Sequence, residues 1–147
     1  MTGLDDRVRL AIYQAFIAGG RPPTVPEAAG AVDAAEEDVA DAYDRLARDR
    51  VIVLAPDTGY VWMAAPFSAM PTRFRVETAR GAWFGNCIWD ALGIPAMLGD
   101  DGVVSTTCPD CGDPFEARVS GGELADDGFV AHFAVPAARW WDDIGYT

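Results

Sequence analysis

The sequence contains no lysine, and its 11 arginines are outnumbered by 23 acidic residues, which gives a formal net charge of −12 at pH 7. Proteins that bind nucleic acids neutralise phosphates with clustered cationic side chains. The shortage of cations therefore argues against a nucleic-acid partner, and the charge serves mainly to keep the protein soluble.

Long apolar runs are also missing. No run reaches the roughly 18 residues that a membrane-spanning helix needs. The N-terminus lacks the basic region and apolar core that are typical of a signal peptide. We therefore expect no membrane partner and a cytoplasmic location.

Cysteine and histidine are scarce. The chain has three cysteines, Cys87, Cys108 and Cys111, and one histidine, His132. In a reducing compartment, three cysteines are expected to be free thiols or metal ligands rather than members of disulfides. His132 lies in a stretch with the alternation of a strand, which favours a surface or hydrogen-bonded core position over a catalytic base.

Half of the residues are hydrophobic, enough for a folded core. The first 50 residues contain three stretches with apolar residues at helical spacing. The second stretch opens with a capping box from Thr24 to Glu27, and a similar signature from Asp33 to Glu36 opens the third. The sequence therefore predicts three helices in this part of the chain.

The spacing of apolar residues then changes to that of strands. Residues 51–54 and 60–63 flank the turn Pro56-Asp57-Thr58-Gly59, which predicts a β-hairpin. Three helices followed by a hairpin are the order of a winged helix. We therefore predict a winged-helix-like module over residues 1–65.

The third helix of a winged helix usually reads DNA. Here that helix is strongly acidic, so phosphates would be repelled, and a packing or dimerisation module is the favoured interpretation. A transcriptional regulator that uses this module stays an alternative. The acidic residues are Glu36, Glu37, Asp38, Asp41, Asp44 and Asp49.

Residues 66–147 are expected to form a second, α+β domain, after a linker at residues 64–67 and 70–71. Several segments alternate in polarity and predict a small, mostly antiparallel sheet with a helix packed on it. Residues 136–147 are expected to start a terminal helix. The predicted strands are residues 72–76, 103–107, 115–119 and 129–135.

The stretch from Gly85 to Leu98 concentrates the chemistry. Asn86 is a suitable N-cap and Pro95 a suitable end for a short helix that carries Cys87 in its first turn. The positive end of the helix dipole would favour the thiolate there. Asp90, three residues on, would share the helix face of Cys87. A thiolate and a proton donor would thus face one substrate.

Simpler interpretations stay open. A cysteine in an apolar helix is often only a small buried side chain, and Asp90 could merely favour the helix dipole. Cys108-Pro-Asp-Cys111 resembles half of a zinc knuckle, so zinc is possible there. Because a structural zinc takes four ligands and few other donors exist, free thiols in a tight turn are favoured.

Together these features resemble the alkylmercury (organomercurial) lyase family. The resemblance rests on the order of a winged-helix-like module, the aromatic-flanked Cys87-x-x-Asp90 followed by Leu-Gly-Ile-Pro-Ala-Met-Leu, and Val-Val-Ser-Thr-Thr-Cys-Pro ending at Pro109. It implies that Cys87 and Asp90 are catalytic, that Cys108 is structural, and that carbon–mercury bonds are cleaved without an added cofactor, with mercury only as substrate or product ion.

The family resemblance also implies a second catalytic cysteine near the C-terminus. Residues 135–147 resemble the run that leads up to it, but the 147 residues contain no cysteine after Cys111, which is the remaining candidate for that role and for a mercury ligand. A thiolate selects soft cations, and a desolvated carboxylic acid can protonate the departing carbon. We expect a small organometallic or other electrophilic substrate and cellular thiols as partners.

The leading hypothesis is therefore an alkylmercury lyase-like enzyme. The alternative within the family binds a thiophilic metal or organometal, or acts on another electrophile, without breaking carbon–mercury bonds.

Overall fold

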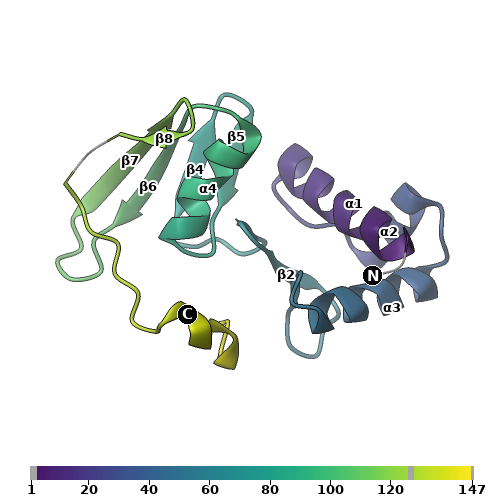
Figure 1. The fold of residues 1–147 in the computed structure, drawn as a ribbon. Helices are drawn as coiled ribbons and strands as arrows, with labels where there is room; N and C mark the ends of the chain where they lie inside the picture. The colour runs from purple at the N-terminus through teal and green to yellow at the C-terminus, as the bar shows by residue number, and fades with distance from the viewer. Residues whose placement is uncertain (1–2, 126–127, 147) are drawn as a thin grey trace.

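The computed structural model describes residues 3–125 and 128–146, and it confirms the α+β class predicted from the sequence. Three helices form one half of the molecule, and a five-stranded sheet with a helix on it forms the other (Figure 1). No helix among the described residues is both long and apolar enough to cross a membrane.

The helical half consists of α1 (Gly3–Gly19), α2 (Val25–Val32) and α3 (Glu36–Arg48). The capping box that opens α2 is confirmed: the Thr24 hydroxyl accepts from the Glu27 amide, and the Glu27 carboxylate accepts from the Thr24 amide. The second predicted box is wrong, because Asp33 takes a left-handed conformation that ends α2. α3 begins after Ala35, whose methyl group cannot accept a hydrogen bond.

A small antiparallel sheet follows. Its strands β1 (Val53–Leu54), β2 (Val61–Ala64) and β3 (Phe67–Ser68) lie in that order, which confirms the predicted hairpin. The prediction of a linker over residues 64–67 is wrong: Ala64 pairs with Phe67 in the sheet, and both side chains are fully buried.

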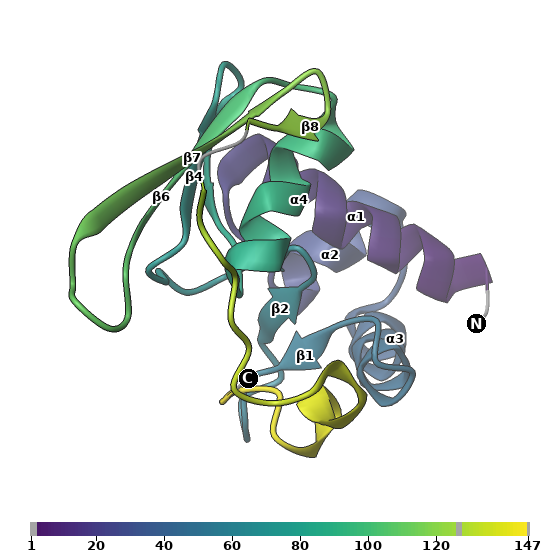
Figure 2. The same cartoon turned by 60° about the vertical axis from the view of Figure 1, so that its left-hand side comes forward.

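The larger sheet is antiparallel throughout, in the order β5-β4-β6-β7-β8. Its register aligns Trp83, Val76, Val104 and Ala117 in one row across neighbouring strands, and all four are buried. Helix α4 (Ile88–Leu98) packs over the sheet (Figure 2). The strands are β4 (Arg75–Thr78), β5 (Gly81–Phe84), β6 (Gly102–Thr107), β7 (Pro114–Ser120) and β8 (Glu123–Leu124).

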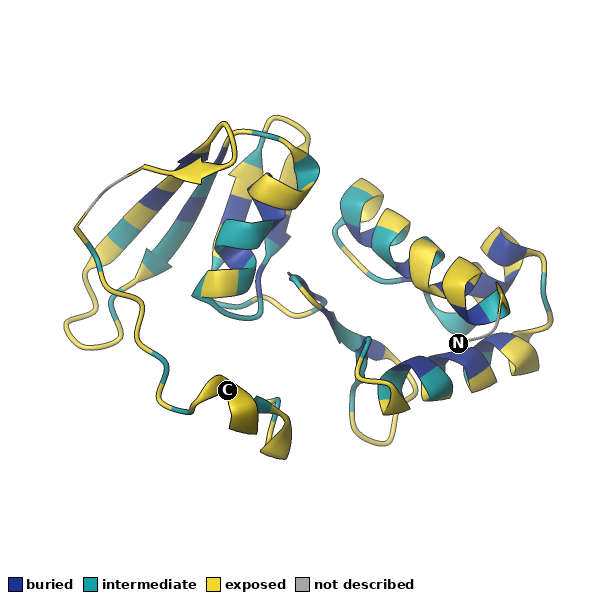
Figure 3. Ribbon diagram, in the orientation of Figure 1, coloured by how far each residue is buried: buried dark blue, intermediate teal, exposed yellow. Residues whose placement is uncertain are grey.

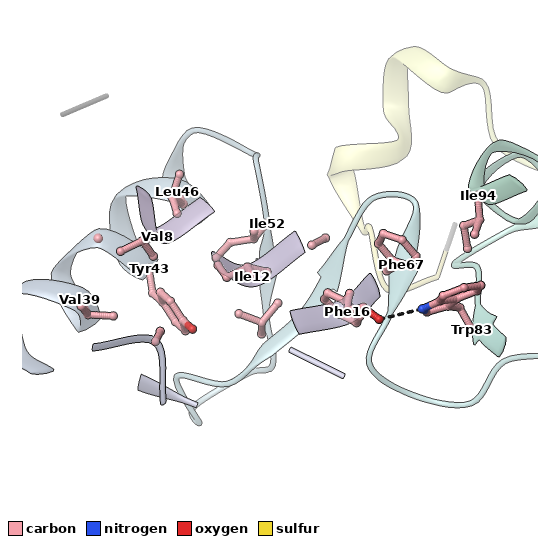
Figure 4. Packing of buried hydrophobic residues seen from close by; sticks show 14 of the residues in the cluster. Val8, Ile12, Phe16, Val39, Tyr43, Leu46, Ile52, Phe67, Trp83 and Ile94 are labelled. Atoms are coloured by element: carbon pink, nitrogen blue, oxygen red, sulfur yellow. Dashed lines mark hydrogen bonds between the residues drawn. The ribbon is translucent and has the colours of Figure 1, made fainter. Parts of the chain in front are cut away.

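Phe67 joins the two halves. Its ring stacks on Phe16 of α1 with centroids 5.3 Å apart and lies 6.3 Å from the Trp83 ring of β5. The Trp83 indole N–H donates to the Phe16 carbonyl over 2.7 Å (Figure 4). One apolar core therefore runs from the helices into the sheet. The division into domains at residues 65 and 66 stays a prediction.

The C-terminal part differs from the prediction. Residues 129–135 form no strand and leave the sheet as an irregular segment that is mostly exposed (Figure 3). Short β8 already pairs with β7 at that edge. In place of the expected terminal helix there is a 3-10 helix, η1 (Ala137–Asp142). Thr147 lies outside the described residues.

Candidate active site

The turn from β5 into α4 positions the predicted reactive residues. Cys87, not Asn86, is the N-cap of α4, so the predicted cap is wrong and the thiol lies just before the first turn. The sequence predicted that this helix ends at Pro95, but α4 continues through Pro95 to Leu98. Proline cannot donate the usual helix hydrogen bond. The Pro95 ring packs closely against Gly102, because a Cβ on Gly102 would lie only 2.7 Å from it.

Gly85 allows this turn to approach α4. A Cβ on Gly85 would lie 2.6 Å from the backbone nitrogen and 2.7 Å from the Cα of Ala91. These are backbone atoms of a helix packed on the sheet, so they cannot move aside alone. The absence of a side chain at Gly85 thus determines how close the start of α4 lies to the sheet.

We predict that Gly85→Ala destabilises the fold by about 1–3 kcal/mol, the usual cost of overpacking, and displaces Cys87. Urea unfolding and the rate of Cys87 alkylation would measure the two effects. Gly93→Ala is a matched control, because a Cβ on that α4 residue meets nothing within 4 Å. Equal stabilities for the two variants would contradict this description of the turn.

Cys87 and Asp90 line the same cavity, of about 690 Å³. The cavity lies between the start of α4, the hairpin and the C-terminal segment, and its walls are largely apolar and aromatic. The sequence predicted that these two side chains share a cavity, and the structure brings them together. Among the walls are Ile52, Met63, Phe74, Trp89, Phe133, Trp140, Trp141 and Tyr146.

Burial raises the pKa of the Asp90 carboxyl above its ordinary value. The Asn86 side-chain amide donates to an Asp90 oxygen over 2.9 Å and opposes this shift in part. The other end of that amide, Asn86 Oδ1, is buried and has no hydrogen-bond partner among the described residues. Asn86 therefore holds the carboxyl group in place while burial favours its protonated form.

The pKa of the Cys87 thiol is also raised, mainly by burial. The backbone amides of Asp90 and Trp89 oppose the shift, and the nearby Asp90 charge adds to it. The amides at the helix end do favour the thiolate, as expected, but desolvation outweighs them, so the net shift of the Cys87 pKa is upward. Cys87 would lose its proton when it binds a cation rather than before.

The raised pKa of Asp90 has a consequence for stability. A carboxyl group whose pKa is higher in the folded state stabilises the protein below its unfolded pKa, and this stability is lost as pH rises through the folded pKa. We predict that Asp90→Asn, which cannot ionise, is more stable than the parent at neutral pH. The difference should disappear near pH 3, below the ordinary aspartate pKa. Urea unfolding at both pH values measures it; a parent that is the more stable of the two at neutral pH would contradict the shift.

Cys108 and Cys111 lie elsewhere, in the turn between β6 and β7. Neither lines the cavity, although Pro109 between them does. The Cys111 side chain interacts with that of Cys108, and no interaction with Cys87 is seen among the described residues. Within residues 3–125 and 128–146, no three His, Cys, Asp or Glu side chains are grouped to hold a metal ion. A role for Cys111 beside Cys87 stays a prediction.

Sequence reasoning missed the two arginines of this cavity. Arg50 and Arg73 both line it, and Arg50 lies over the Trp141 ring at 5.3 Å from its centroid. Trp141 is 91 residues away in the chain, so no local pattern relates the two. His132 also lines the cavity, in the irregular segment rather than in the predicted strand.

Fold and cavity together define an α+β protein in which a half-buried thiol and a carboxyl group with a raised pKa line the same apolar space. The family model for alkylmercury lyase (MerB) matches residues 67–147, more than half of the sequence. The chain therefore belongs to the alkylmercury lyase family, as its sequence predicted.

A solved structure described as the mercury-bound form of MerB2 has the same fold, with a TM-score of 0.66 and 21% sequence identity. The alignment covers 86% of this chain and 60% of that chain. No curated protein matches the sequence.

Proposed function

We propose that this chain cleaves the carbon–mercury bond of organomercurials, with Cys87 as the thiolate that takes the metal and Asp90 as the proton donor. The observation that carries the proposal is that both side chains line one largely apolar cavity, where burial favours the protonated carboxyl. Membership of the alkylmercury lyase family supports it.

The reaction begins when an organomercurial arrives as the adduct of a small cellular thiol. The Cys87 sulfur binds the mercury, and its proton passes to the small thiolate, which departs as a thiol. The carbon–mercury bond then breaks, its electron pair takes the Asp90 proton to form a C–H bond, and mercury(II) stays on Cys87. Two small thiols remove the ion as a bis-thiolate; one of their protons restores Asp90 and the other restores the Cys87 thiol. The reaction needs no added cofactor.

The cavity suits such a substrate. Soft thiolate ligands select mercury over hard cations, and the aromatic walls offer an apolar place for the organic group. The terminal segment that resembles the approach to the family's second catalytic cysteine lines this cavity with Trp140 and Trp141. A small thiol can supply the further sulfur that mercury(II) needs.

The test is anaerobic incubation of the reduced protein with phenylmercury and an excess of a small thiol, followed by measurement of benzene. We expect benzene above the rate without protein, and none above that rate from Cys87→Ser. Phenylmercury bound in equal amount with no benzene would instead support the alternative of a family member that only binds organometals.

Regulation of transcription has less support. Helix α3 exposes five acidic residues: Glu36, Glu37, Asp38, Asp41 and Asp44. Its Arg45 forms an ion pair with the buried Asp5 at 2.8 Å. A surface of this charge repels DNA phosphates. We expect no binding to duplex DNA at low salt. Binding under those conditions would support a role in transcription.

A further inference from the structure

We propose that Cys108 and Cys111 form a second thiol site, separate from the cavity, which binds a soft two-coordinate metal ion such as mercury(II). The site lies in the turn that joins β6 to β7. Binding at this site requires no carbon–mercury cleavage, so the site can be tested independently of the proposed function.

The turn brings the two sulfurs together. The Cys108 amide donates to the Asp113 carbonyl over 2.9 Å, and the Gly112 amide donates to the Cys108 carbonyl over 2.9 Å. These two bonds close a tight loop that carries both cysteines, and the Cys108 and Cys111 side chains interact with each other. Gly112 takes a positive φ of 78° that other residues rarely adopt. The pair is therefore arranged by the backbone before any ion binds.

The surroundings decide which ions suit the pair. Zinc in structural sites takes four ligands, and no group of three His, Cys, Asp or Glu side chains among the described residues could supply even three. Mercury(II) is satisfied by two thiolates, and soft ligands favour soft ions. Two thiols without further ligands thus select a soft ion of low coordination number.

The position of the site relates it to the cavity. Pro109, between the two cysteines, forms part of the cavity wall, while Cys111 is exposed to solvent and Cys108 is half-buried. An ion on this pair would therefore be held at the edge of the cavity and remain open to exchange with solution.

Binding is an exchange of thiols. A mercury(II) ion that arrives with two small thiolates forms two new bonds to the Cys108 and Cys111 sulfurs. The two protein thiols lose their protons, and the small thiols leave and take those protons up. Because the second protein sulfur is held beside the first, its attachment is intramolecular and gains from a high effective concentration.

The experiment uses the Cys87→Ser protein, whose only thiols are Cys108 and Cys111. Mercury(II) chloride is added with a large excess of 2-mercaptoethanol, small molecules are removed, and the retained mercury is measured. We expect one ion per chain, held about 10²-fold more tightly than by Cys87→Ser/Cys111→Ser, the low end of the gain from linking two groups. Equal retention by the two variants would overturn the site.

A thermal unfolding measurement distinguishes binding of the ion to the folded turn from binding by any two thiols of the unfolded chain. An ion that binds only the folded turn raises the unfolding midpoint. We expect mercury(II) to raise the midpoint of Cys87→Ser and not that of Cys87→Ser/Cys111→Ser, which should fold normally because Cys111 is exposed. An unchanged midpoint in Cys87→Ser, or zinc(II) retained in preference to mercury(II), would contradict the proposal.

Discussion

Replacing Asp90 by Asn is expected to lower the rate of carbon–mercury cleavage by about 10²- to 10⁴-fold, the usual contribution of a general acid. Asparagine has nearly the shape of aspartic acid and can still accept the hydrogen bond from Asn86, but it cannot give up a proton at neutral pH. Capture of phenylmercury by Cys87 should continue, because that step uses only the sulfur.

Single-turnover measurements separate the two steps. Loss of the free Cys87 thiol reports capture, and benzene reports cleavage. Asp44→Asn is the matched control, since Asp44 is exposed on α3 and does not line the cavity. Benzene released by Asp90→Asn at the rate of the parent protein would show that the proton comes from another donor.

The second large effect is expected from Phe67→Ala, which should lower the free energy of unfolding by about 3–5 kcal/mol. Phe67 is fully buried, stacks on Phe16 and lies beside Tyr13 and Trp83. The truncation would leave a cavity where the helices meet the sheet. The loss combines the missing apolar burial with the contacts that the surrounding rings no longer make.

Urea unfolding followed by tryptophan fluorescence and by circular dichroism measures this loss. Met70→Ala is a nearby control at an exposed position, and we expect it to change stability by about 0.5 kcal/mol or less. A loss below about 1 kcal/mol for Phe67→Ala would contradict a core shared by both halves. Separate transitions for the two probes would instead support independent domains over residues 1–65 and 66–147.

Much of the fold followed from local patterns. The capping box at Thr24, the hairpin around Pro56 and the alternation in residues 103–107 and 115–119 each depend on neighbours in the chain, and each element is present. The errors arose where packing overrode a local signal. Pro95 stays inside α4 because Gly102 makes room for its ring, and residues 129–135 alternate in polarity yet pair with no strand among the described residues.

The site was predictable only in part. The three-residue spacing of Cys87 and Asp90 placed both near one helix end, and the structure puts both on one cavity. Their burial could not be read from the sequence, because it depends on side chains from the hairpin and the C-terminal segment. That burial reverses the expected effect on the Cys87 pKa. Arg50 likewise reaches the cavity through its contact with Trp141, which only the fold creates.

The most direct test of the account locates the mercury during a single turnover. The protein is mixed with one equivalent of phenylmercury, and its peptides are analysed by mass spectrometry at successive times. We predict a phenylmercury adduct on Cys87 that loses its phenyl group as benzene appears. A lasting phenylmercury adduct, or benzene released while Cys87 stays unmodified, would contradict the assignment of this cavity as the active site.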